Sequence, residues 1–375
     1  MTTSNESVIK KLLLVFLVFA GLYFAKEFLM PLAIGGILAT LFLPFCKWLE
    51  GKSIPKGLAA FICVLLLLLG FAGVGALLGF QISALAKDWD TIQHQAAIAW
   101  KSVQEYIFTN LGISAEQQME IITNQQSALN GITMTIAGSL AYVFTSFILL
   151  ITYLFLFLYY RTHIKDFLLK LSPPEQRTEM QKVVYSAANV SQQYLLGLAK
   201  MIGCLWIMYS IGFSIVGVEH AFFFAVLCGL LEIIPFVGNI TGTSITVLVA
   251  AAQGGSAPML ASIVLTYGIV QLIQGWILEP LIVGPQVQIN PFATVIALVL
   301  GELVWGIPGI ILAIPITAML KIACDHIPPL KPYGFLIGEL DTSTEKTDLV
   351  EQLKTRLALL LHKKKPVRKK AVKHT

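Results

Sequence analysis

The chain has 375 residues, of which 56% are hydrophobic and 13% are charged, and its formal net charge is +5 at pH 7. In soluble domains roughly a quarter of the residues are charged, and no soluble core absorbs this much apolar surface. The composition excludes an ordinary soluble enzyme or binding domain, and it makes lipid the expected solvent for most of the chain.

Apolar runs near or above the length of a spanning helix recur along the chain, and almost none carries a charge in its middle. We predict an all-α polytopic membrane protein with about eight hydrophobic segments. In chain order the segments are 10–25, 28–46, 58–80, 132–160, 195–217, 220–252, 258–279 and 291–323. The first follows Lys10 and Lys11 as the apolar part of a signal peptide would. Further segments follow it directly, so we interpret it as an uncleaved signal anchor.

These segments divide the chain into five predicted parts. The parts are an N-terminal transmembrane pair (1–57), segments flanking an external loop 82–130 (58–160), a cytoplasmic loop (161–190), a transport core (191–325), and a cytoplasmic amphipathic and basic tail (326–375).

Orientation is predicted from the positive charges, because Lys and Arg in short loops are retained on the cytoplasmic side. Excess positive charge places the connections 47–56 and 161–182, and both termini, in the cytoplasm. The 82–130 region is richer in acidic residues and lies between two predicted spans, so we expect it outside. The predicted location is the bacterial cytoplasmic (inner) membrane.

Two segments are broken in the middle by proline and glycine. The first, 221–252, is broken around 234–239, and the second, 291–321, around 306–309. Each arm would have about 14 residues and reach about 21 Å, short of a hydrocarbon core of about 30 Å. We therefore predict two re-entrant hairpins. Two pairs of short full spans with proline kinks are the open alternative.

The two broken segments also resemble each other in sequence. The matched positions are Leu227, Gly229, Glu232, Pro235 and Gly238 in the first, and Val299, Gly301, Glu302, Pro308 and Gly309 in the second. With one crossing between them, at 258–279, the hairpins would enter from opposite faces. This is the inverted-repeat pattern of transporters, in which freed backbone groups meet near the midplane and bind substrate or ion.

An ionisable residue inside a membrane segment is costly and is by default a functional candidate. Glu232 lies one turn before the first break and Glu302 just before the second, and for both a functional and a structural role stay open. The predicted pathway residues are Glu232, Pro235, Gly238, Asn239, Thr241, Gln271, Gln274, Glu302, Pro308 and Gly309, with Glu279 and Asn290 as weaker candidates. We predict that the site lies between the hairpin tips, with Glu232 as the coupling carboxylate and Gln271 and Gln274 as a polar wall.

Motifs of nucleotide binding, metal binding and hydrolysis are missing from the sequence. It contains no GxxxxGK[ST] loop, no HExxH or GxSxG motif, and no paired Cys/His ligand spacing. We predict no enzyme activity, no cofactor, no metal and no nucleic-acid partner, so ATP-driven transport would need a separate subunit.

The C-terminal tail has a membrane-binding pattern of its own. Leucines 349, 353, 357 and 360 are spaced as on an amphipathic helix over 348–362, and a basic run follows from Lys363. We predict that the tail contacts anionic lipid of the inner leaflet. A disordered solubilising tail is the alternative.

Several motifs of the final third resemble the autoinducer-2 exporter family of bacterial membrane transporters. They are Ile234-Pro235-Phe236-Val237-Gly238, Gln271 through Pro280, Gly284, Asn290-Pro291, Gly301 through Gly309, and Ala313-Ile314-Pro315. The resemblance extends over about 10–325. It implies export of small polar molecules, with autoinducer-2 as the namesake, and sodium/proton antiport in some relatives.

Three positions relate this chain to the family pattern differently. Glu232 matches a position that is often acidic in the family, which favours it as the coupling residue. Where this chain has Gln274 the family commonly has Glu, and where it has Glu302 the family commonly has a small residue. A coupling role therefore does not carry over to position 274.

We predict a secondary transporter that exports a small polar solute, driven by an ion gradient, and that works as a homo-oligomer. A sodium/proton antiporter and a non-transporting membrane scaffold are the two alternatives. Glu232 and Glu302 would serve either kind of transporter.

Overall fold

The computed structural model describes residues 2–87, 94, 98, 109, 126–235 and 237–339. Within these ranges all secondary-structure elements are helices, and strand pairing is limited to one bridge between Ile289 and Gly338. The predicted all-α class is confirmed. The predicted external loop 82–130 falls mostly outside the described residues, and the tail helix 348–362 falls wholly outside them.

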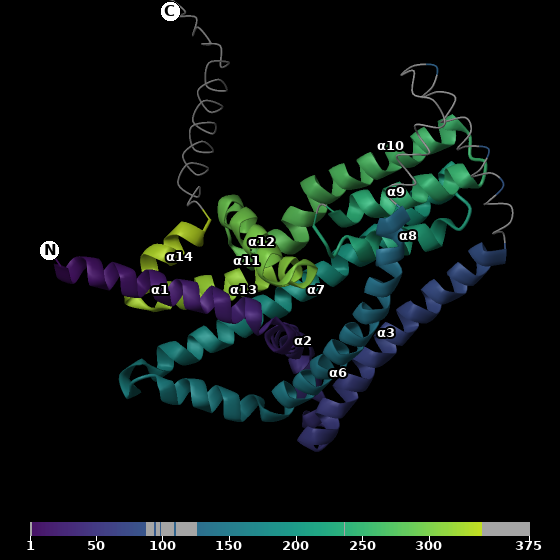
Figure 1. Cartoon of the computed structure of the whole chain (residues 1–375). Helices are drawn as coiled ribbons and strands as arrows, with labels where there is room; N and C mark the ends of the chain where they lie inside the picture. The colour runs from purple at the N-terminus through teal and green to yellow at the C-terminus, as the bar shows by residue number, and fades with distance from the viewer. Residues whose placement is uncertain are drawn as a thin grey trace, which may run out of the picture.

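The helices follow one another in the order shown in Figure 1. They are α1 (Thr2–Phe24), α2 (Lys26–Gly51), α3 (Lys56–Lys87), α6 (Gln126–Leu171), α7 (Arg177–Val216), α8 (Ala221–Leu231), α9 (Val237–Ala252), α10 (Ala257–Ile273), the π-helix η2 (Gln274–Val283), α11 (Gly284–Val287), α12 (Pro291–Trp305), α13 (Ile307–His326) and α14 (Lys331–Ile337), with 3₁₀ turns η1 (Pro174–Gln176) and η3 (Pro328–Leu330).

Six helical stretches of the described chain are long and apolar enough to cross a membrane. They are Lys26–Gly51, Lys56–Phe80, Tyr142–Leu171, Pro174–Val216, Ala257–Val283 and Ile307–His326, while Leu12–Phe24, Ala221–Leu231, Val237–Ala252 and Pro291–Trp305 are shorter apolar helices. The described chain thus has six candidate membrane spans and four shorter apolar helices where we predicted about eight hydrophobic segments.

The N-terminal helices α2, α3 and α6 share one apolar core, in which each of the three packs on the other two. Small residues of this core, Ala39, Ala59 and Ala60, are almost fully buried and let the helices approach closely. A Cβ added to Gly35 would lie 3.0 Å from the Tyr153 Cβ and 3.2 Å from the Leu154 backbone nitrogen. Gly35 is therefore needed where α2 meets α6.

One ion pair joins α2 to α6 at the edge of this core. The Arg161 guanidinium donates to the Glu50 carboxylate, and the two side chains are only 18% and 19% exposed. Arg161 also lies 3.4 Å from the Cys46 sulfur. Both charges lie in or beside the connections predicted to be cytoplasmic, and their pairing was not predicted.

Removing one partner of this pair is expected to destabilise the protein. Arg161→Gln leaves the half-buried Glu50 carboxylate without its cation, at a cost of about 1–3 kcal/mol in the free energy of unfolding. The double variant Glu50→Gln, Arg161→Gln should recover most of that loss. Thermal unfolding in detergent measures both. Lys182→Gln, which breaks an exposed pair with Glu179, is the control and should leave the unfolding midpoint unchanged. Equal losses in the single and double variants would contradict a stabilising pair.

Helix α7 is the central element of the rest of the protein. It packs against α8, α10, α13, α2 and the π-helix η2. Its aromatic residues Tyr209 and Phe213 are 0% exposed and stack with ring centroids 5.4 Å apart. Phe224 of α8 and Ile263 of α10 complete this core.

The segment 161–190, predicted as a cytoplasmic loop, is helical on both sides of a tight turn. Helix α6 continues to Leu171, and α7 begins at Arg177, directly after η1. Prolines 173 and 174 stop α6 because proline cannot continue a helix. At 46 and 40 residues, both helices exceed the roughly 20 residues that cross a bilayer. Their charged ends therefore extend beyond the hydrocarbon, where a charge count cannot distinguish helix from loop.

Both broken segments form pairs of packed helices. In the first, α8 and α9 pack on each other across the break at 232–236, and in the second α12 and α13 reverse at Gly306, whose φ is 64°. The arms have 11, 16, 15 and 20 residues. The expected arm length of about 14 residues is wrong for α13, because this helix tolerates Pro315 in its interior and continues to His326.

A glycine closes each pair just after its break. A Cβ at Gly238 would overlap the Leu231 carbonyl group, and a Cβ at Gly309 would overlap the Gly301 carbonyl group. In both pairs the second arm therefore touches the backbone of the first, which only glycine permits. The matched glycines Gly238 and Gly309 thus have the same packing role in the two segments.

Candidate functional site

The first break places a buried carboxylate against the start of the π-helix. Glu232 follows the last residue of α8 and is 7% exposed, and Gln274, the first residue of η2, is 6% exposed. The Gln274 Nε2 donates to the Glu232 Oε1 over 2.6 Å. Two residues 42 positions apart are thus joined where each of their helices departs from regular α geometry.

The π-helix η2 replaces the end of the predicted segment 258–279. Pro280 lies inside it, and in an α-helix this residue would remove the hydrogen bond to the Trp276 carbonyl. A wider turn accommodates the proline, and π-helical turns occur often at functional sites. The sequence analysis foresaw a polar face here but not the wider turn.

Further polar groups lie on α7, α9 and α10, which pack against α8 and the π-helix that carry this pair or against each other. The Gln271 Nε2 donates to the Tyr209 hydroxyl over 3.2 Å, and Tyr209 is fully buried on α7. The Thr246 hydroxyl donates to the Gly242 carbonyl over 2.8 Å on α9. Gln271 and Gln274, the two residues of the predicted polar wall, thus both donate side-chain hydrogen bonds, and Tyr209 accepts one of them. A hydroxyl inside the apolar run 195–217 was the only sequence signal for Tyr209.

Three buried side-chain oxygens, at the first break, on η2 and on α9, have no hydrogen-bond partner within the described residues. They are Glu232 Oε2, Gln274 Oε1 and Thr243 Oγ1. An unpaired buried polar group costs about 1–3 kcal/mol, so such groups in native proteins call for a proton, an ion, water or a ligand. The arrangement has the chemistry of a small polar binding site with one acidic group.

The remaining predicted residues of the first break have local roles. Asn239 is buried, and its Oδ1 accepts from the Ile240 backbone nitrogen over 2.9 Å. Thr241 is exposed, and its hydroxyl donates to the Val237 carbonyl over 2.7 Å. Pro235 forms the turn and Gly238 closes it.

The second break has different neighbours. Glu302 is exposed, and its backbone carbonyl accepts from the Gly306 nitrogen over 2.7 Å. The Trp305 Nε1 donates to the Leu22 carbonyl of α1 over 3.0 Å. Across the described chain, no hydrogen bond or ion pair joins the first break to the second. Because α12 and α13 pack on α1, α2 and α7, the structure assembles the Glu232 half of the predicted site and leaves Glu302, Pro308 and Gly309 outside it.

The two weaker candidates make no hydrogen bond to the Glu232–Gln274 pair among the described residues. Glu279 is exposed on the π-helix. Asn290 caps α12, where its Oδ1 accepts from the Ala293 nitrogen over 2.8 Å. Its Nδ2 donates to the carbonyls of Leu336 and Gly338 over 2.7 and 2.8 Å, which is a structural use of this side chain.

A known family accounts for a helical chain with several candidate membrane spans. The sequence model of the AI-2E family transporters matches residues 12–328. The chain belongs to the AI-2E transporter family. The resemblance stated from the sequence is thereby confirmed, and this AI-2E protein is a multi-pass membrane transporter by family.

Individual AI-2E relatives are similar along most of their length. YueF of Bacillus subtilis (strain 168) is 29% identical over 80% of this chain and 84% of its own. The protein sll0063 of Synechocystis sp. (strain ATCC 27184 / PCC 6803 / Kazusa) is 28% identical over 83% of this chain and 80% of its own. The AI-2 transport protein TqsA of Escherichia coli (strain K12) is 20% identical over 91% of this chain and 98% of its own.

Proposed function

We propose that this AI-2E transporter is a secondary exporter of a small polar solute of the autoinducer-2 type, driven by an ion gradient through Glu232. The observation that carries the proposal is the buried Glu232–Gln274 hydrogen bond, which leaves one unpaired oxygen on each side chain. The name of TqsA supports autoinducer-2 as the substrate class, and this chain shares most of its length with that protein.

Glu232 has the properties that ion coupling requires. A carboxylate that is isolated from water is costly as an anion and is stabilised by binding a proton or a cation. Its Oε1 accepts a hydrogen bond from Gln274, so its Oε2 is the atom available to bind and release a proton or a cation. A proton or cation bound there would also change what the adjacent Gln274 oxygen contacts, which links ion binding to the polar wall.

Sodium/proton antiport is the second candidate, and one observation favours it. The hydrogen-bonded side chains of Glu232 and Gln274 each keep one unpaired oxygen, and oxygen is the ligand type that hard cations such as sodium prefer. In this alternative the cation itself is the transported species and no organic solute moves.

Transport by purified protein in proteoliposomes separates these candidates. A proton or sodium gradient is imposed, and flux is measured for autoinducer-2, for a panel of small polar solutes and for sodium itself. Gradient-dependent solute flux supports the exporter, and sodium–proton exchange without solute flux supports the antiporter. Absence of any protein-dependent flux would favour the scaffold alternative and contradict both.

The proposal includes a topology with both termini and the connections 47–56 and 161–182 in the cytoplasm, and with the two broken helix pairs as re-entrant hairpins. It also includes a homo-oligomer and contact of the 348–362 tail with anionic lipid.

Cysteine labelling tests the topology. In a cysteine-free background, Glu105→Cys is expected to react with a membrane-impermeant reagent in intact cells, because 82–130 carries excess acidic charge between two predicted spans. Lys182→Cys should react only after permeabilisation. The reverse pattern at the two positions would overturn the proposed orientation.

A further inference from the structure

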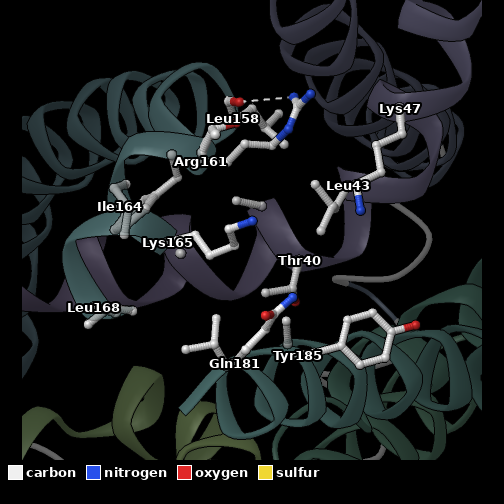
Figure 2. A pocket seen from close by; sticks show the side chains of 16 residues that line it. Thr40, Leu43, Lys47, Leu158, Arg161, Ile164, Lys165, Leu168, Gln181 and Tyr185 are labelled. Atoms are coloured by element: carbon white, nitrogen blue, oxygen red, sulfur yellow. Dashed lines mark hydrogen bonds between the residues drawn. The ribbon is translucent and has the colours of Figure 1, made fainter. Parts of the chain in front are cut away.

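A cavity of about 410 Å³ lies between α2, α6 and α7, away from Glu232. Two lysines, Lys47 of α2 and Lys165 of α6, line it together with Gln181 of α7. In Figure 2 the amines of Lys47 and Lys165 reach into the cavity from two sides, while the amide of Gln181 approaches Thr40 from below. Three helices thus bring cationic and hydrogen-bonding groups to one space.

The two lysines are the free charges of this cavity. Arg161 also lines it, but its guanidinium is engaged by Glu50. Among the described residues, no carboxylate lies within 4.0 Å of the amine of Lys47 or Lys165. Two unpaired positive charges that face one cavity would be stabilised by an anionic ligand.

A second cavity, of about 370 Å³, continues from the first. The two share Gly36, Thr40 and Phe157 as lining residues, and the second is otherwise apolar. Its apolar walls include Leu29 of α2 and Trp305 of α12. From position 47 to position 36, α2 rises about 16 Å at 1.5 Å per residue. This matches half of a hydrocarbon core of about 30 Å.

The pairing of a cationic end with an apolar continuation selects the ligand. A free inorganic anion would satisfy the lysines but leave the apolar cavity unfilled, and a neutral lipid would fill the cavity but leave the lysines unpaired. We propose that the two cavities together hold one anionic phospholipid. Its phosphate contacts Lys47 and Lys165, and one acyl chain runs along α2 past Gly36 towards Trp305.

The site has a defined place and effect in the fold. The positive-inside pattern puts Lys47 and Lys165 at the cytoplasmic face, so the lipid would come from the inner leaflet. The lipid would join α2, α6 and α7 to the α12–α13 pair, because Trp305, Ile316 and Met319 line the second cavity. It does not depend on the proposed substrate or coupling ion.

Lipid binding by the purified full-length protein tests the charge requirement. The probes are phosphatidylglycerol, phosphatidylcholine and inorganic phosphate, and bound lipid is counted by native mass spectrometry over a titration. Lys47→Gln and Lys165→Gln are each expected to weaken phosphatidylglycerol binding about fivefold, and the double variant about 25-fold. Lys170→Gln, an exposed lysine on α6 that does not line the cavity, should bind as the unmodified protein does. The basic tail is identical in all variants, so its contribution cancels.

A second variant tests the acyl-chain path with both lysines intact. A Cβ at Gly36 would meet the Phe157 ring at 3.5 Å, an ordinary contact, so Gly36→Ala should be neutral. Gly36→Leu blocks the junction of the two cavities and is expected to weaken phosphatidylglycerol at least tenfold. If the glutamine variants do not insert, Lys165→Arg, which keeps the charge, should retain lipid, and Gly36→Leu still decides.

Three outcomes would overturn the proposal. The first is phosphatidylcholine binding as tight as that of phosphatidylglycerol. The second is equal phosphatidylglycerol affinity in the Lys47→Gln, Lys165→Gln double variant and in Lys170→Gln. The third is inorganic phosphate binding that is lost in the double variant, together with phosphatidylglycerol binding that is unchanged in Gly36→Leu, which would identify a site for a soluble anion.

Discussion

Glutamine in place of Glu232 is expected to reduce gradient-driven transport to the level of protein-free liposomes. The substitution keeps the size of the side chain and can keep a hydrogen bond with Gln274, but it removes the group that binds a proton or a cation. Glu232 is 7% exposed, and its Oε2 has no partner within the described residues. The measurement is solute flux under an imposed proton or sodium gradient, at equal reconstituted protein.

Matched carboxylates serve as controls for this result. Glu279→Gln and Glu302→Gln remove the same charge from exposed positions, and both are expected to have mild effects. The Glu232→Gln protein should still insert and elute at the same oligomeric size. If it transports as the unmodified protein does, Glu232 leaves the mechanism, and either Glu302 or a site without a titrating carboxylate takes its place.

Alanine in place of Gly238 is the second variant for which a large effect is expected. The added Cβ would overlap the Leu231 carbonyl group and lie 3.2 Å from the Glu232 backbone nitrogen. Backbone atoms cannot rotate away, so the turn that carries Glu232 must open. We expect a loss of about 1–3 kcal/mol in the free energy of unfolding, together with loss of transport, because the Glu232–Gln274 contact depends on that turn.

Gly268→Ala is the matched control for this variant. Gly268 lies on α10, and a Cβ there would meet nothing within 4 Å. Alanine is favoured over glycine in a helix interior by about 1 kcal/mol, so this variant should be as stable as the unmodified protein or more so. Thermal unfolding and flux measured in parallel decide the comparison. Full transport by Gly238→Ala would show that the closed turn is not needed.

Much of this fold could be predicted from the sequence because the patterns that predict it are local. Apolar runs identified the membrane helices, and Pro235 and Gly306 identified both helix reversals. The contacts that could not be predicted join residues that are distant in the chain. Nothing in the sequence paired Glu50 with Arg161 or Gln271 with Tyr209, since each pair is set by how two helices pack.

In the candidate site, too, the residues could be predicted from the sequence but their neighbours could not. Glu232 and Gln274 were both predicted, each from a polar residue in an apolar run, and the structure joins them. Glu302 was predicted by the same reasoning and by the likeness of the two broken segments, yet it is exposed. Sequence symmetry shows that two segments have similar internal packing, but it does not show which neighbours they face. Here the neighbours are α7, α10 and η2 for the first pair, and α1, α2 and α7 for the second.

The hydrogen bonds of Asn290 give the second helix pair a property that the first lacks. They connect the start of α12 to the last turn of α14 and the residue that follows it, and a backbone bridge joins Ile289 to Gly338 beside them. The helices between Asn290 and Gly338 therefore form one unit whose two ends are joined by hydrogen bonds. The chain enters it through Gln288, whose φ is 48°. Because its ends are held together, we expect any displacement of this helix pair against α7 to move α14 along with α12 and α13.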